Sequence, residues 1–334
     1  MRKNRDSSAN TIYNGGMSFA YRTFRMKQIL PAIGFCVFLA GCGGVSAETR
    51  VTEQPAEPLT ETAGGGTYDP PDMKTSEFHP DQAEGDTGAA IDVSCVNEGY
   101  VAVSAVSDKR LKFQVIKGED TYNYDLRNNG IPSILPLQCG NGQYSFRIME
   151  NIVDKKYAVL FETTADVTLN SEFEPFLRPN DYVNYDKDSK CVKQAAELSA
   201  RASGQLDVVT AVYDFICKNV KYDVKKAEST EKMYLPDPDE TMTSGKGICF
   251  DYASLAASML RSQGIPTKVI FGYVSPDDLY HAWNMFYTEE TGWVTAEFRV
   301  DTKTWTRLDL TFSANGSDAK FIGDGSNYTD LYQY

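Results

Sequence analysis

The sequence predicts an α+β protein with two folded parts, an antiparallel β-sandwich followed by a domain of mixed helices and strands. Between residues 91 and 180, apolar and polar residues alternate in short runs that turn-forming residues separate, as in antiparallel strands. The second domain is expected over residues 185–334, where the apolar residues from Val208 to Ile216 recur at three- and four-residue intervals, which indicates an amphipathic helix. The length of 334 residues exceeds the roughly 250–300 residues that one core serves, so more than one domain is expected.

The composition is acidic, with a formal net charge of −13 from 33 basic and 46 acidic residues. Such a surface repels the phosphate backbone, so nucleic acid is not expected as a partner. The acidity alone identifies no substrate.

Residues 1–41 predict a leader and a signal peptide. Arg25 and Lys27 precede an apolar run over residues 29–40, which is typical of a secretory signal and too short to span a bilayer with ease. The run ends in Leu39-Ala40-Gly41-Cys42, which resembles the lipobox of bacterial lipoproteins. The resemblance implies cleavage before Cys42, a lipid on Cys42, and a protein that is exported and anchored to the outer face of the cell membrane. An ordinary signal with a chance cysteine is the alternative.

Residues 42–90 are rich in Gly, Glu, Thr, Pro and Asp without an apolar period, and predict a disordered tether in which His79 is exposed. Residues 91–180 predict a small immunoglobulin-like β-sandwich. Its strands are expected over 100–106, 111–116, 122–126, 143–149 and 156–163. No catalytic constellation occurs in them, so the sandwich is expected to space or position other parts.

Four of the seven cysteines lie in pairs within the two predicted domains. An exported protein could oxidise them as Cys95–Cys139 and Cys191–Cys217. Four buried thiols are the alternative, since cysteine is often a plain core residue. Without a Cys-x-x-Cys pair, and with His281 as the one histidine of the predicted domains, no metal site is expected. No cofactor is expected either.

Cys249 lies at the start of a predicted helix. Apolar residues recur after it at helical spacing: Tyr252, Ala253, Leu255, Ala256, Met259 and Leu260. Gly264 and Pro266 predict the end of that helix. The free N–H groups and the positive dipole end of a first turn favour a thiolate and can bind an oxyanion. A buried structural cysteine is the alternative interpretation.

Two further residues complete a candidate catalytic set. His281 begins a predicted strand over residues 281–287 and is a candidate base for the thiol. Asp309, on a later strand, could accept a hydrogen bond from the other imidazole nitrogen and fix its tautomer. Spacing alone does not establish that the three side chains meet.

Residues 244–309 resemble the core of the transglutaminase-like superfamily, which is related to papain-type cysteine proteases. The segments that carry the resemblance are, in chain order, Gly245 to Ala253, Leu260 to Pro266 with Gly272-Tyr273, His281-Ala282-Trp283-Asn284, and the set Trp305, Asp309 and Thr311. The resemblance implies that Cys249, His281 and Asp309 are catalytic. Glu297, four residues after Trp293, is the alternative orienting carboxylate. Leu310 stands where the family usually has proline.

The resemblance implies acyl transfer through a thioester. The Cys249 thiolate would attack a peptide bond or a glutamine side-chain amide, and water or an amine would resolve the thioester. The backbone N–H of Cys249 and a second donor, for which Tyr222 is a candidate, would hold the oxyanion. A peptidase or amidase is favoured over a cross-linker, with proteins or peptides as substrates, cell-wall peptides among them. A catalytically inactive scaffold or binding module at the cell surface is the alternative.

Overall fold

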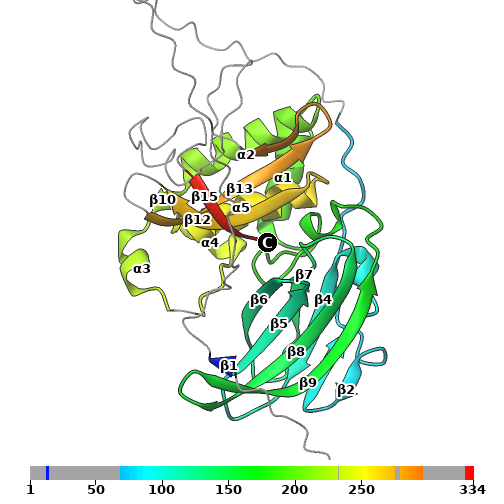
Figure 1. The fold of residues 1–334 in the computed structure, drawn as a ribbon. Helices are drawn as coiled ribbons and strands as arrows, with labels where there is room; N and C mark the ends of the chain where they lie inside the picture. Colours follow the sequence, from blue (N-terminus) through cyan, green and yellow to red (C-terminus); the bar gives the residue numbers. More distant parts are fainter. Residues whose placement is uncertain (1–12, 15–67, 232, 275–278, 296–327) are drawn as a thin grey trace, which may run out of the picture.

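The computed structural model describes residues 13–14, 68–231, 233–274, 279–295 and 328–334. The chain forms a β-domain over residues 84–167 and an α/β domain from residue 190 onward, which lie below and above the marked C-terminus in Figure 1. Among the described residues, no helix is long and apolar enough to cross a membrane.

The β-domain consists of two antiparallel sheets. The order in the first is β1 (Tyr13–Asn14), β9 (Lys156–Val167), β8 (Gly142–Val153), β5 (Leu111–Lys117) and β6 (Asp120–Leu126). The order in the second is β2 (Glu84–Asp86), β3 (Ala89–Asp92), β4 (Tyr100–Ala105) and β7 (Ser133–Pro136). A short 3₁₀ helix, η1 (Val96–Glu98), precedes β4.

The alternation that predicts the strands also sets the core. Leu111, Phe113 and Val115 of β5 are buried while the residues between them are partly exposed, because successive side chains point to opposite faces of a strand. All five predicted strands are present, as β4, β5, β6, β8 and β9. The fold is therefore mixed α and β as expected, and the immunoglobulin-like type of the β-domain stays a prediction.

The folded part begins earlier in the chain than the sequence predicts. Strand β2 and the first two residues of β3 lie within the predicted tether of residues 42–90. The hydroxyl of Tyr68 donates to the carbonyl of Gln263, 2.6 Å away, so residue 68 already contacts the α/β domain. His79 is not an exposed tether residue, because its Nδ1 lies 3.0 Å from the carboxylate of Asp92. Cys42 lies outside the described residues.

The α/β domain places helices around one central helix. The helices are α1 (Lys190–Ser199), α2 (Gln205–Asn219), α3 (Val224–Ser229), α4 (Pro238–Ser244) and α5 (Cys249–Ser262), and η2 (Glu174–Phe176) precedes them. Every residue of α5 from Phe250 to Ser262 is buried, because α1, α2, α4 and a sheet pack around it. Figure 1 shows α5 between the other helices and that sheet.

The sheet that covers α5 is antiparallel. Its order is β14 (Gly292–Thr295), β13 (Leu279–Thr288), β12 (Thr267–Val274) and β15 (Tyr328–Gln333). A separate parallel pair joins β10 (Lys221–Tyr222) to β11 (Lys246–Gly247), directly before α5. This pair fixes the position of the chain just before Cys249.

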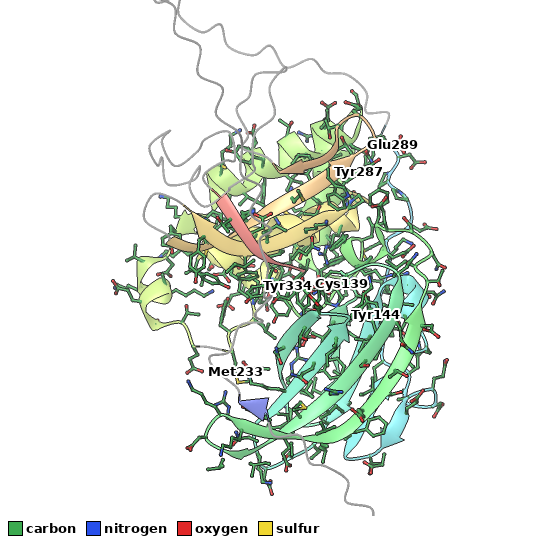
Figure 2. All side chains as sticks on the ribbon, in the orientation of Figure 1. Cys139, Tyr144, Met233, Tyr287, Glu289 and Tyr334 are labelled. Atoms are coloured by element: carbon green, nitrogen blue, oxygen red, sulfur yellow. The ribbon has the colours of Figure 1, made fainter. Side chains whose placement is uncertain are left out.

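The last residue of the chain lies between the two domains. The ring of Tyr334 stacks on Tyr182 at 4.1 Å between centroids, and its edge contacts Tyr122 and Tyr124 of β6. Figure 2 shows Tyr334 at this junction. Arg261 of α5, 1% exposed, donates to the Tyr334 carbonyl at 2.9 Å. One apolar core therefore runs through both domains.

Candidate active site

Cys249 is the first residue of α5, as the sequence predicts. Gly245 ends α4 in the left-handed conformation, with φ at 63°, and the short β11 then leads into α5. A side chain at Gly247 would place its Cβ 2.7 Å from the Cβ of Asp251, so glycine is required there for the chain to pass close to the helix. The two glycines thus fix the approach to the cysteine.

Cys249 lies where the backbone N–H groups of the first turn of α5 point out of the helix. Its side chain is half-buried and lies at the N-terminal, positive end of α5, whose residues from Phe250 to Ser262 are all buried. Among the described residues, none accepts a hydrogen bond from the Cys249 backbone N–H. That N–H is therefore available to an oxyanion next to the sulfur.

Asp251 holds the start of α5 in place, and sequence reasoning missed it. It is fully buried, and its Oδ2 lies 2.8 Å from both the Ile248 backbone N and the Lys226 Nζ. The Tyr234 hydroxyl donates to its Oδ1 at 2.5 Å. One signal could have found it: a carboxylate at the third position of an otherwise apolar helix commonly accepts from the residue before the helix.

Tyr222 lies close to Cys249, as its candidate role requires. It pairs with Gly247 across β10 and β11, two residues before the cysteine. Burial raises the pKa of the Tyr222 hydroxyl, and negative charge on Cys249 and Asp251 raises it further. The hydroxyl therefore stays protonated at neutral pH and can donate a hydrogen bond.

A cavity of about 300 Å³ opens beside Cys249, between the two domains. The β-domain contributes Asn123 and Asp125 of β6, and the α/β domain contributes residues from α5, β12 and β13. Met233, which also lines it, lies beside the β-domain in Figure 2. The sulfur is therefore accessible from a site that could hold a ligand.

His281 is buried, 4% exposed, in β13, and pairs with Gly272 of β12. Its neighbours Tyr280 and Ala282 belong to the strand face that meets the cavity and α5, since Tyr280 lines the cavity and Asn284 of the same face donates to the Ala253 carbonyl at 2.9 Å. Strand alternation puts His281 on the other face.

On that other face the His281 ring stacks near Trp283, with 6.3 Å between centroids. His281 is not among the described residues that line the Cys249 cavity. The structure thus brings β13 against α5 but does not put the imidazole into the cavity. Asp309 and the alternative Glu297 lie outside the described residues, so the position of the orienting carboxylate stays a prediction.

The two predicted disulfides are not formed in the structure. Cys95, Cys139, Cys191 and Cys217 are all free thiols. Cys191 is buried near Asp239, and burial first and then that carboxylate raise its thiol pKa. Burial raises the pKa of Cys217 to about 11. Packing within the domain accounts for both residues. Among the described residues, no cluster of three His, Cys, Asp or Glu side chains could hold a metal ion.

Comparison with known families identifies the second domain. Residues 192–309 match the transglutaminase-like superfamily. The chain contains a transglutaminase-like domain. This confirms the resemblance seen in the sequence, and the matched residues include Cys249, His281 and Asp309.

The similarity to individual proteins is more distant. Kyphoscoliosis peptidase of Mus musculus is 28% identical over 104 residues, which cover 28% of this chain and 16% of the mouse protein. The human protein is 27% identical over 104 residues with the same coverage. The chain thus spans only a small part of the length of these relatives. Among solved structures, the periplasmic domain of TgpA from Pseudomonas aeruginosa is 14% identical, with 70% of this chain and 73% of that one covered and a TM-score of 0.32.

Proposed function

We propose that the transglutaminase-like domain is a cysteine-dependent acyl-transfer enzyme in which Cys249 is the nucleophile. The observation that carries the proposal is the position of Cys249: a half-buried sulfur at the N-terminus of a buried helix, open to a cavity. A structural cysteine does not need the adjoining cavity. The peptidases among the related proteins support hydrolysis of amides as the reaction.

His281 is the proposed base, and Asp309 the carboxylate that orients it. The sequence has two histidines, and His79 is bonded to Asp92 in the β-domain, so a histidine base for Cys249 has to be His281. His281 follows the cavity-lining Tyr280 directly. The proposal requires the start of β13 to turn the imidazole from the Trp283 face toward the sulfur when the site is active.

The reaction proceeds in two acyl-transfer steps. His281 takes the thiol proton, and the Cys249 sulfur forms a bond to the carbonyl carbon of a peptide bond or glutamine side chain. The backbone N–H of Cys249 and the Tyr222 hydroxyl hold the oxyanion, and His281 returns the proton to the departing amine. Water then cleaves the thioester, which gives a peptidase or amidase rather than a cross-linker.

The proposed setting is the cell surface. Cleavage before Cys42 and lipidation of its sulfur would anchor the protein to the outer face of the membrane. Cell-wall peptides and exported proteins are then within reach as substrates. We also propose that the β-domain is an immunoglobulin-like sandwich that helps to position them.

A specific observation favours a second candidate, a catalytically inactive module that binds a partner. His281 lies on the strand face opposite the cavity, and a module that only binds a partner has no need of an imidazole beside the sulfur. The two candidates differ in the reactivity of one thiol.

Iodoacetamide labelling at neutral pH, followed by mass spectrometry, separates them. Cys95, Cys139 and Cys217 are free thiols of the same molecule and serve as internal controls. The enzyme is expected to label at Cys249 at least about tenfold faster than at these controls. Equal labelling at all four cysteines, together with no release of amine or new amino terminus from a peptide library, would refute the enzyme and favour the binding module. Adding a primary amine to the same library separates hydrolysis from cross-linking.

A further inference from the structure

Six aromatic rings line the cavity beside Cys249. Tyr182 comes from the segment between the two domains, and the α/β domain contributes the rest: Tyr234, Phe250, Phe271, Tyr280 and Tyr334. Several contact one another edge to face, as Phe250 and Phe271 do at 4.9 Å and 74°. Edge-to-face packing of this kind can accept one more ring at low cost, because ring edges and faces attract each other.

The charged groups of the cavity are largely neutralised. Asp181 pairs with Arg127 at 3.1 Å. Asp125 lies 3.5 Å from Lys112. Among the described residues, no cation lies within ion-pair distance of Glu231, which is exposed. Within the described part of the chain, the cavity therefore offers no net positive charge to an acidic group, and Glu231 is a carboxylate without an ion-pair partner.

The cavity is an interdomain feature that the transglutaminase-like domain does not form alone. Asn123 and Asp125 belong to β6 of the β-domain, and Tyr334 reaches the cavity from the far end of the chain. Tyr334 is held from behind, since its backbone N and O pair with Val269 at 2.8 Å each. The ring is thus fixed where a substrate next to Cys249 would contact it.

We propose that this cavity is a specificity subsite that receives an uncharged aromatic side chain of the peptide whose amide Cys249 attacks. The effect of this subsite on catalysis rests on the proposed function, whereas the binding of an aromatic side chain rests on the cavity alone. The aromatic wall supplies the affinity, and Glu231 disfavours acidic side chains. A volume of about 300 Å³ is at the lower end of ligand pockets and suits one side chain rather than a large cofactor. The β-domain therefore helps to select the substrate.

Leu235 and Glu231 allow the proposal to be tested without disturbing the core. Both line the cavity, Leu235 is half-buried and Glu231 is exposed. Leu235→Trp fills the cavity, and Leu235→Met, which keeps the volume, is the matched control. Glu231→Lys reverses the charge at the edge, and Glu231→Gln only removes it.

Two readouts separate the subsite from the catalysis. The first is saturation-transfer difference NMR, in which saturation passes from the full chain carrying Cys249→Ala to a bound probe. The probes are the amides of N-acetyl-phenylalanine, N-acetyl-alanine and N-acetyl-aspartate. The second is kcat/KM of the wild-type chain on peptides that differ only in Phe, Ala or Asp beside the cleaved amide. The rate of iodoacetamide labelling at Cys249 controls for damage to the nucleophile.

The proposal predicts that only the phenylalanine probe binds, that Leu235→Trp abolishes its binding, and that Leu235→Met does not. It predicts kcat/KM at least about tenfold higher for Phe than for Ala, with this ratio falling toward one in Leu235→Trp at unchanged labelling. Glu231→Lys should raise turnover of the Asp peptide alone. Equal binding of the three probes, or a phenylalanine signal that survives Leu235→Trp, would overturn the subsite. Phenylalanine binding without turnover or fast labelling would instead refute the proposed enzyme and leave the subsite standing.

Discussion

Replacing Asp251 by asparagine tests how the first turn of α5 is held. The carboxylate accepts from the Lys226 ammonium and the Ile248 N–H at 2.8 Å each, and from the Tyr234 hydroxyl. Asparagine has nearly the same shape and can still accept from the backbone. The substitution therefore removes chiefly the negative charge and leaves the Lys226 ammonium beside a neutral amide.

The expected loss in free energy of unfolding is about 2–3 kcal/mol. Removing one partner of a buried ion pair costs roughly 3–5 kcal/mol. Asp251 is fully buried, but the Lys226 side chain is 27% exposed, so water reduces the cost of its stranded charge. For a chain of this size, a loss of this magnitude lowers the melting temperature by about 3–6 °C.

Urea and thermal unfolding of Asp251→Asn, Lys226→Met and the double variant measure this interaction. The double variant removes the stranded ammonium as well and should recover at least about 1 kcal/mol relative to Asp251→Asn. Asp237→Asn is the matched control, because Asp237 caps α4 at an exposed position and asparagine caps equally well. A change below about 0.5 kcal/mol in Asp251→Asn, or strictly additive effects in the cycle, would show that the ion pair does not hold the helix start.

Three further outcomes follow from single residues. Asp239→Ala should cost about 1 kcal/mol at pH 7, since its carboxylate accepts from the Lys190 and Cys191 N–H groups at the start of α1. Burial works to raise the Asp239 pKa, but these hydrogen bonds lower it overall. The stabilisation is therefore complete above the ordinary pKa of 3.8 and is lost as the pH falls through the lower pKa of the folded state. Unfolding measurements that show the same stability difference between wild type and variant at pH 2 as at pH 7 would contradict this. Arg261→Leu should cost about 3–5 kcal/mol in urea unfolding, because three buried carbonyls lose their donor, and a cost below 1 kcal/mol would speak against it. Tyr222→Phe should lower kcat by about 10²- to 10³-fold with KM within about twofold if its hydroxyl holds the oxyanion, whereas a change in KM alone would assign it to substrate binding.

The elements with strong periodic signals could be predicted from the sequence. Strand β5 alternates over seven residues, and α5 has an apolar stripe with a glycine after its end, so both were found within a few residues. Strands β2, β3 and β7 are three or four residues long, and alternation over so short a run is indistinguishable from chance. The tether was therefore predicted to extend too far.

The candidate site was predicted in part for a similar reason. The glycines and the apolar stripe placed Cys249 at a helix start, because capping and periodicity are local properties. Strand alternation puts His281 and Asn284 on opposite faces, but only the folded structure shows that the Asn284 face meets α5. Asn123 and Cys249 line the same cavity from the two domains, and no local sequence pattern predicts that residues so far apart in the chain lie near each other.

The pH dependence of Cys249 alkylation tests the central claim most directly. Rates of iodoacetamide labelling at Cys249 are measured from pH 4 to 10 in the wild-type chain and in His281→Gln. If His281 activates the thiol, the wild-type profile has its midpoint well below the ordinary cysteine value of about 8.5, and His281→Gln returns it to that value. Superimposable profiles with a midpoint near 8.5 in both proteins would contradict a Cys249–His281 catalytic pair.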